Sequence, residues 1–199
     1  MSTRWGSERG TPVDRYFIDG FLESRADVIA GRVLEIKNRL YTTRFDRGVS
    51  VSDVLDIDES NRHANIVADL AAADEVPSDT YDCFILTETL HVIYEVKSAI
   101  FHAHRILKPG GSLLVTAPCI SPMDSELADI ESWRFTRNSC RLLFEGVFGE
   151  GEVEIETYGN FVTCTAFLAG MAVEELDREC LLESSDIYVQ GVCVHARKR

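Results

Sequence analysis

The stretch Gly31-Arg32-Val33-Leu34-Glu35-Ile36, followed by Lys37-Asn38-Arg39-Leu40-Tyr41, decides the fold. Its first half is a short apolar run that begins at a glycine and carries one acid near its end, which predicts a buried strand. A strand that opens an alternating strand–helix pattern delivers its ligand loop at the carboxyl edge of a parallel sheet. Here that loop holds three long side chains where a nucleotide-binding fold usually has glycines. The interpretation of function depends on this loop.

Outward from this strand, apolar runs alternate with amphipathic stretches along the chain. Further strands are predicted over residues 48–56, 65–70, 81–87, 112–117, 153–158 and 188–196. Helices are predicted over residues 13–29, 40–45, 91–107, 136–148 and 161–182. The pattern predicts an α/β fold: a Rossmann-like three-layer sandwich with a doubly wound, mostly parallel seven-stranded sheet and a C-terminal antiparallel hairpin strand. Residues 1–11 are predicted to be a flexible N-terminal tail, and residues 12–199 a single domain.

Composition narrows the classes of partner. The formal net charge is -13, with 20 basic against 33 acidic residues. Such a charge repels phosphate backbones and acidic lipids, so we expect a small-molecule partner and neither nucleic acid nor a membrane. The six cysteines are scattered without a C-x-x-C pair, which predicts reduced thiols and no metal site. No signal peptide or spanning segment is recognised, so a cytoplasmic location is expected.

Four segments in order carry a family resemblance. They are Val33-Leu34-Glu35-Ile36; Ala68-Asp69-Leu70 with Val76-Pro77; YDCFILTETLH over residues 81–91; and RILKPGGSLL over residues 105–114. Together they resemble class I S-adenosylmethionine-dependent methyltransferases of the type 11 kind, over roughly residues 30–118. The last two segments are the most specific. The resemblance implies that S-adenosylmethionine is the cofactor and that residues 12–199 form a methyltransferase-like domain.

The same resemblance implies roles for individual residues at the cofactor. Glu35 is expected near the methionine part, and either Asp53 or Asp56 is expected to bind the ribose hydroxyls. Asp69 is expected to face the adenine amino group, with Leu70 against the ring. These roles suit the chemistry, because carboxylates bind vicinal hydroxyls and accept hydrogen bonds from an amine.

The residues after the fourth strand are the candidates for catalysis. The resemblance places Thr87, Glu88 and His91 on the floor of the cleft, with Thr87 on the cofactor side. His91 is the candidate general base, because the ordinary pKa of histidine lies near neutrality, and Glu88 is its expected orienting partner. The alternative is that His91 is a packed histidine at the start of a helix.

The glycine-rich loop of the family, G-x-G-x-G, is replaced by Lys37, Asn38 and Arg39. Long side chains narrow a pocket there, and a cation ~4–6 Å from a sulfonium repels it by about 1–4 kcal/mol. Lys37 or Arg39 is compatible with the cofactor if it binds the methionine carboxylate or if it points to solvent. Alternatively, these cations together with Arg44 bind a phosphate-like anion.

Two regions are candidates for contact with the substrate. Arg15 or Tyr16, on the first predicted helix, lies over the ligand in one interpretation; in the other, that helix only covers the edge of the sheet. Trp133 and Arg134 follow the fifth predicted strand, in a segment that commonly caps the acceptor site in this fold class. The alternative for this pair is a hydrophobic plug with a surface arginine.

Three functions are therefore open. The leading hypothesis is an S-adenosylmethionine-dependent methyltransferase acting on a metabolite, glycan or natural-product intermediate. A second keeps the fold but binds a nucleotide or phosphorylated substrate and catalyses elimination or cyclisation. A third is a non-catalytic partner subunit of a biosynthetic complex.

Overall fold

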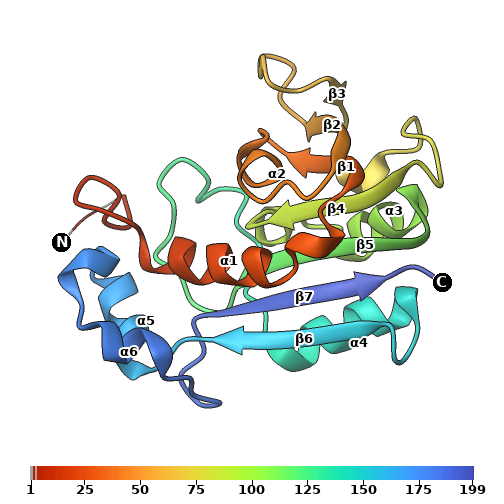
Figure 1. Cartoon of the computed structure of the whole chain (residues 1–199). Helices are drawn as coiled ribbons and strands as arrows, with labels where there is room; N and C mark the ends of the chain where they lie inside the picture. Colours follow the sequence, from red (N-terminus) through yellow and green to blue (C-terminus); the bar gives the residue numbers. More distant parts are fainter. Residues whose placement is uncertain (1, 3) are drawn as a thin grey trace.

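Within the part of the chain that the structure describes, residue 2 and residues 4–199, seven strands form one sheet in the order β3-β2-β1-β4-β5-β7-β6. The structure is a computed structural model, shown in Figure 1. The strands are β1 (Gly31–Ile36), β2 (Val49–Asp56), β3 (Ile66–Val67), β4 (Tyr81–Thr87), β5 (Leu107–Pro118), β6 (Val153–Tyr158) and β7 (Gly191–Arg197). Neighbours are parallel except β7, which is antiparallel to β5 and β6. The predicted fold class is confirmed.

Helices cover both faces of the sheet, and the alternation of side chains along the strands explains why. Val33 of β1 and Ile85 of β4 lie in the core under α1 (Val13–Ser24), whereas Leu34 and Phe84 lie in the core under α3 (Val96–Ile106) and α4 (Arg137–Phe148). Burying such side chains stabilises the fold by about 1.5–3 kcal/mol each. The remaining helices are α2 (Leu40–Arg44), α5 (Phe161–Leu168) and α6 (Arg178–Leu182), with 3-10 turns at Ala26–Val28, Leu70–Ala72, Leu90–Val92 and Val173–Glu175.

Two predicted elements are wrong in extent. The helix expected over residues 161–182 is broken after Leu168, because Gly170 has a φ of 66° and a chain in the left-handed region cannot continue an α-helix. The third strand is only Ile66–Val67, because the Asp69 carboxylate accepts a hydrogen bond from the Ala71 amide at 2.9 Å and starts a 3-10 turn.

Other boundaries shift by a few residues. The helix expected over residues 91–107 is a 3-10 turn followed by α3, and β5 begins at Leu107 instead of residue 112. The last strand begins at Gly191 instead of residue 188, and the first helix ends at Ser24.

The N-terminal residues from Arg4 onward form turns that lie against the segment after α5. The Thr11 amide donates to Glu174 at 2.8 Å, Arg9 Nε lies 3.0 Å from Glu175, and Pro12 forms an isolated bridge with Ala172. The flexibility expected for residues 1–11 stays a prediction, and residues 1 and 3 lie outside the described residues. None of the described helices has the length and apolar character needed to cross a bilayer.

The sheet order places the site. β1 and β4 are adjacent and parallel, with Glu35 opposite Ile85, so the loops after both strands emerge together at the carboxyl edge. The α1 helix crosses the front of the sheet and brings its first residues toward that edge (Figure 1).

Candidate active site

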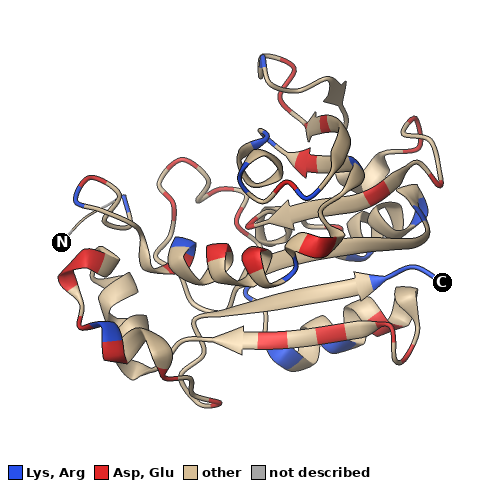
Figure 2. Cartoon of the chain, viewed as in Figure 1, with Lys and Arg blue, Asp and Glu red and all other residues tan. Residues whose placement is uncertain are grey.

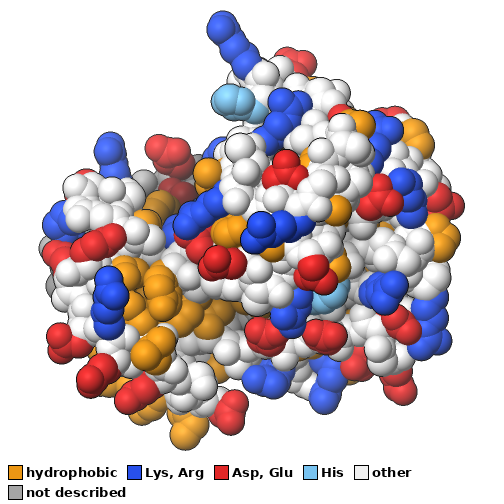
Figure 3. Space-filling model, viewed as in Figure 1, with side chains coloured by type: hydrophobic (Ala, Val, Ile, Leu, Met, Phe, Trp, Pro, Cys, Tyr) orange, Lys and Arg blue, Asp and Glu red, His pale blue; other side chains and the backbone are white. Residues whose placement is uncertain are grey.

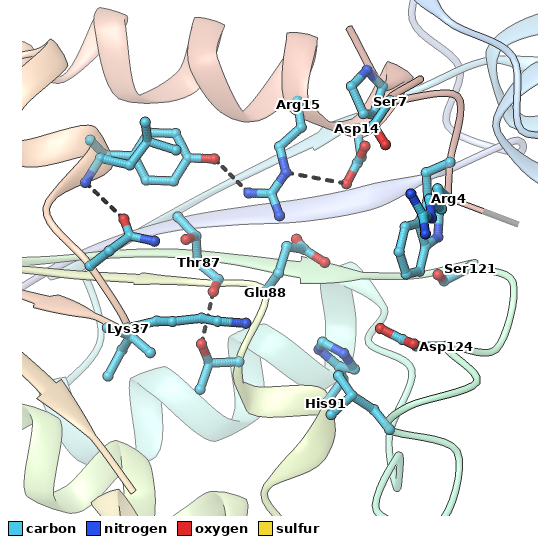
Figure 4. Close-up of a pocket in the computed structure, with 18 of the residues that line it drawn as sticks. Arg4, Ser7, Asp14, Arg15, Lys37, Thr87, Glu88, His91, Ser121 and Asp124 are labelled. Carbon is cyan, nitrogen blue, oxygen red and sulfur yellow. Dashed lines mark hydrogen bonds and ion pairs between the residues drawn. The ribbon is translucent and has the colours of Figure 1, made fainter. Parts of the chain in front are cut away.

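A cavity of about 470 Å³ lies at the carboxyl edge, within the size range of small-molecule sites. Its walls come from the loops after β1 and β4, the start of α1, the segment of residues 121–131 and the N-terminal turn (Figure 4). The predicted residues that line it are Glu35, Lys37, Thr87, Glu88 and His91. Residues from five parts of the chain therefore converge at this edge.

Glu35 organises the loop after β1. Its buried carboxylate accepts hydrogen bonds from the amides of Tyr41 at 3.0 Å and Thr42 at 2.8 Å, at the start of α2. Burial raises the pKa of Glu35, and the two amides oppose that shift by favouring the charged form. Both oxygens are engaged, so Glu35 positions the loop at the cavity wall.

Lys37 has a φ of 70°, a left-handed conformation that favours glycine. The backbone thus keeps the kind of turn a glycine supplies, although the residue is a lysine. The Asn61 side chain donates to the Lys37 carbonyl at 2.7 Å, which ties this loop to the one after β2. Figure 4 shows the Lys37 side chain extending below Thr87 and Glu88, at the cavity.

Glu88 directly follows β4 and also has a positive φ, 43°. Its Oε1 atom is buried and has no hydrogen-bond partner among the described residues. Burial, reinforced by the Asp14 carboxylate, raises the pKa of Glu88 to about 7. A strained backbone and a carboxyl that titrates near neutrality are both features that gather at functional sites.

His91 lies in the 3-10 turn after β4 and is 8% exposed. Burial lowers the pKa of His91, so its imidazole is neutral at neutral pH and is able to accept a proton. The carboxylate nearest to it is that of Glu131, 4.0 Å from Nε2, which in turn pairs with Arg134 at 2.6 Å. No ion pair or hydrogen bond among the described residues joins His91 to Glu88, its expected partner.

Asp14 and Arg15 bring two charges from the start of α1. Arg15 Nη1 donates to the Tyr41 hydroxyl at 2.6 Å, and its Nε lies 3.9 Å from Asp14 Oδ2. Burial raises the pKa of Asp14. Arg15 was one of two predicted alternatives for this helix and lines the cavity; Asp14 was missed. An acid in the first turn of a helix is most simply explained by the helix dipole, so the sequence carries no signal for its role.

The acids predicted for ribose lie outside the cavity lining. Asp53 is buried in the body of β2, where it accepts from Arg32 Nε at 2.8 Å, from Asn65 at 2.6 Å and from the Tyr81 hydroxyl at 3.2 Å. Asp56 ends β2 at the carboxyl edge and accepts from Asn61 at 2.5 Å. The position of Asp56 at the carboxyl edge therefore favours it over Asp53 as the acid that binds ribose.

The two residues predicted for adenine also lie outside the cavity lining. Asp69 is exposed and its carboxylate caps the 3-10 turn Leu70–Ala72. Leu70 is 3% exposed and packs in the core beneath α3. Their predicted roles stay predictions.

The other predicted substrate contacts, Tyr16, Trp133 and Arg134, do not line the cavity. Tyr16 lines a separate hollow beneath α1, where Figure 3 shows hydrophobic side chains gathered. Trp133 stacks on Tyr94, with ring centroids 6.0 Å apart, and its Nε1 donates to the Ile93 carbonyl at 3.1 Å. Arg134 reaches the cavity wall only through its pair with Glu131.

This strand order with a cavity at the ends of β1 and β4 defines a Rossmann-like methyltransferase fold. A family model described as a methyltransferase domain matches residues 16–144. The chain belongs to that family, which confirms the resemblance to class I S-adenosylmethionine-dependent methyltransferases.

Solved structures with the same fold include a SAM-dependent methyltransferase from Archaeoglobus fulgidus, 14% identical, with a TM-score of 0.61, covering 92% of this chain and 94% of that one. A putative methyltransferase in complex with the Trm112 activator from Haloferax volcanii is 16% identical, with a TM-score of 0.62 and coverages of 94% and 91%. The [4+2]-cyclase SpnF is 14% identical, with a TM-score of 0.61 and coverages of 96% and 84%. Comparison with curated proteins gives no match.

Proposed function

We propose that this protein is an S-adenosylmethionine-dependent methyltransferase that acts on a small-molecule acceptor in the cavity at the ends of β1 and β4. The observation that carries the proposal is the convergence, in a chain of this family, of Lys37, Glu88 and His91 on one cavity. When bound, S-adenosylmethionine supplies an electrophilic methyl group. The chain's own residues bind and orient the cofactor and the acceptor, and they remove a proton from the acceptor.

The residues at the end of β1 fit the methionine part of this cofactor. The left-handed backbone at Lys37 preserves the turn of a glycine loop, and Lys37 and Arg15 both line the cavity, where either cation suits a carboxylate. Arg39 does not line the cavity. At the adenosine part, Asn61 donates to Asp56 Oδ2, and the remaining acceptor capacity of that carboxylate suits the ribose hydroxyls.

His91 suits proton removal from the acceptor because its neutral imidazole lines the cavity. General base catalysis of this kind contributes typically ~10²–10⁴-fold in rate. Glu131, at 4.0 Å from Nε2, stabilises the protonated ring once it forms. Alignment of the two reactants in the cavity is expected to supply the larger part of the rate enhancement.

Isothermal titration with S-adenosylmethionine and S-adenosylhomocysteine tests the proposal. Micromolar, saturable binding is expected, and Arg15→Ala is expected to weaken it while the exposed Arg141→Ala, remote on α4, leaves it unchanged. The absence of detectable binding at millimolar concentrations of either ligand rejects methyl transfer.

A second candidate follows from the cations of the cavity. Arg4, Arg15 and Lys37 line it beside five acidic residues, and a phosphorylated substrate for a step other than methylation would bind at these three cations. Titration with ADP and with inorganic phosphate distinguishes the two functions. Absence of binding to all of these ligands would leave the third hypothesis, a non-catalytic partner subunit.

A further inference from the structure

Three buried polar atoms without a hydrogen-bond partner among the described residues belong to side chains that line one cavity. They are Asp14 Oδ1, Glu88 Oε1 and His91 Nδ1. Buried polar atoms in folded proteins are nearly always hydrogen-bonded, to protein or to ordered water, so three such atoms at one cavity mark a place where a ligand or water binds. The Thr116 hydroxyl lies near the Glu88 carboxyl and opposes the rise of its pKa.

All three atoms are acceptors when both carboxyl groups are ionised and the His91 ring proton is on Nε2. Carboxylate oxygens only accept hydrogen bonds. His91 Nε2 faces the Glu131 carboxylate at 4.0 Å, which attracts the ring proton to that nitrogen and leaves the lone pair on Nδ1. His91 is buried, with an exposed fraction of 8%, and no donor among the described residues reaches its Nδ1 atom.

The nearby cation does not satisfy these atoms. Arg15 Nε lies 3.9 Å from Asp14 Oδ2, the other oxygen of that carboxylate, and Arg15 Nη1 is committed to the Tyr41 hydroxyl. In Figure 4, Glu88 lies between Arg15 above and His91 below. The strained backbone of Glu88, with a φ of 43°, holds its carboxyl at this place.

We infer that Asp14, Glu88 and His91 form a site for a protonated primary amine. An alkylammonium has three N–H donors and one positive charge, and the site offers three unpartnered acceptors, two of them on carboxyl groups. An alcohol brings too few hydrogen-bond donors, and a carboxylate brings a charge of the wrong sign. The existence of the site does not depend on the proposed function. The proposed function enters only in the identity of the molecule that carries the amine, which is either the methyl acceptor or the amino-acid end of S-adenosylmethionine.

Two comparisons at pH 8, where Glu88 is ionised, separate these sources. In the first, wild-type protein is titrated with S-adenosylhomocysteine and with its analogue in which hydrogen replaces the α-amino group. In the second, protein with and without saturating S-adenosylhomocysteine is titrated with phenethylamine and with 2-phenylethanol, which differ only in the ammonium. We expect the amine to bind at least tenfold more tightly than its partner in one of the two comparisons, which identifies the source.

Glu88→Gln and Asp14→Asn are expected to remove that preference while binding of the amine-free partner is retained. Glu179→Gln, the same charge change at an exposed residue on α6 that does not line the cavity, is the matched control and is expected to keep the preference. Thermal unfolding of each variant shows that it is folded, and the wild-type comparisons do not depend on the variants.

Equal binding within both pairs, or binding of neither member of either pair, overturns the site. So does an amine preference that survives in both Glu88→Gln and Asp14→Asn. Loss of S-adenosylhomocysteine binding with an intact amine preference removes the proposed function but keeps the site, so the two failures are distinguishable.

Discussion

Lys37 has a backbone conformation that ordinarily belongs to glycine, and its side chain occupies the cavity where a glycine loop leaves room. A non-glycine residue in this region is strained by about 1–2 kcal/mol. Replacement by glycine relieves the strain but also frees the unfolded chain, so we expect Lys37→Gly to gain about 0.5–1 kcal/mol in free energy of unfolding. Urea unfolding measures this change.

Lys37→Ala is the matched variant, because it removes the long side chain and keeps the strain. It is expected to leave the free energy of unfolding within ~0.5 kcal/mol of wild type. If the lysine side chain only narrows the pocket, both variants bind S-adenosylhomocysteine more tightly. If it binds the methionine carboxylate, both bind more weakly, and unequal effects would show that the turn itself governs affinity.

Glu88 makes the stability of the protein depend on pH. Its pKa is raised from 4.5 to about 7 in the folded state, so the folded protein holds this proton more tightly than the unfolded chain. The stabilisation is fully present below about pH 4.5 and is lost as pH rises through about 7, an effect on the order of 3 kcal/mol.

Glu88→Gln removes that dependence. We expect the difference in free energy of unfolding between Glu88→Gln and wild type to move in favour of the variant between pH 5 and pH 8. Urea unfolding at both pH values measures it, with Glu126→Gln as the exposed control. A difference that stays constant with pH would show that Glu88 titrates normally.

Among the elements, Asn160 joins two helices by a single side chain. Its Oδ1 accepts from the amides of Val162 at 2.9 Å and Thr163 at 3.0 Å and so caps α5. Its amide group donates to the carbonyls of Cys180 at 2.6 Å and Glu183 at 3.0 Å, at α6. One buried residue therefore satisfies four backbone groups.

Asn160→Ala loses both functions and is expected to reduce the free energy of unfolding by about 2–4 kcal/mol. Asn160→Ser keeps an N-cap and loses only the donors, so about half of that loss is expected. Thr136→Ala, which removes the exposed cap of α4, is the comparison and is expected to lose about 1 kcal/mol. Equal losses for Ala and Ser at position 160 would show that the cap contributes nothing.

The strands and helices show what sequence patterns predict and what they miss. The bounds of β1 and β4 were predicted residue for residue, because apolar runs with alternate burial are local signals. The break at Gly170 was missed, because the residues around it are apolar as in a continuous helix. The space that a Cβ at Gly170 needs is taken by Ser2, from the opposite end of the chain, and no local pattern reports such a contact.

The residues of the candidate site also divide into those that the sequence predicts and those that it does not. Glu35, Lys37, Glu88 and His91 were predictable as neighbours, because the carboxyl ends of adjacent parallel strands share an edge. Asp14 was not, because its place depends on how α1 docks across the sheet.

On the scale of the whole molecule, charge is arranged to hold distant segments together. Figure 2 shows acidic residues on most elements, including β6, where Glu154 and Glu156 pair with Arg25 at 3.1 and 2.5 Å. Glu174 and Glu175 bind the N-terminal turn, and Arg4 and Trp5 of that turn line the cavity. The acidic excess thus includes carboxylates that hold the N-terminal turn, which forms one wall of the cavity.

The attachment of the N-terminal turn to Glu174 and Glu175 is expected to be weak and reversible. The contacts of Thr11 with Glu174 and of Arg9 with Glu175 are exposed, and exposed ion pairs contribute little to global stability. We expect the double variant Glu174→Gln/Glu175→Gln to unfold at nearly the wild-type temperature. Hydrogen exchange of residues 4–11 is expected to become at least tenfold faster, and affinity for S-adenosylhomocysteine to fall because the cavity opens.

Raised salt is expected to reproduce both effects in wild type and to change the double variant little, because screening acts on the charges that the substitution removes. Glu179→Gln, an exposed acid on α6 with no ion pair among the described residues, is the control for net charge. Unchanged exchange in the double variant would show that the backbone contacts, such as the Val173 amide to the Thr11 carbonyl at 2.8 Å, hold the turn without the carboxylates. Faster exchange with unchanged affinity would show instead that the turn does not close the cavity.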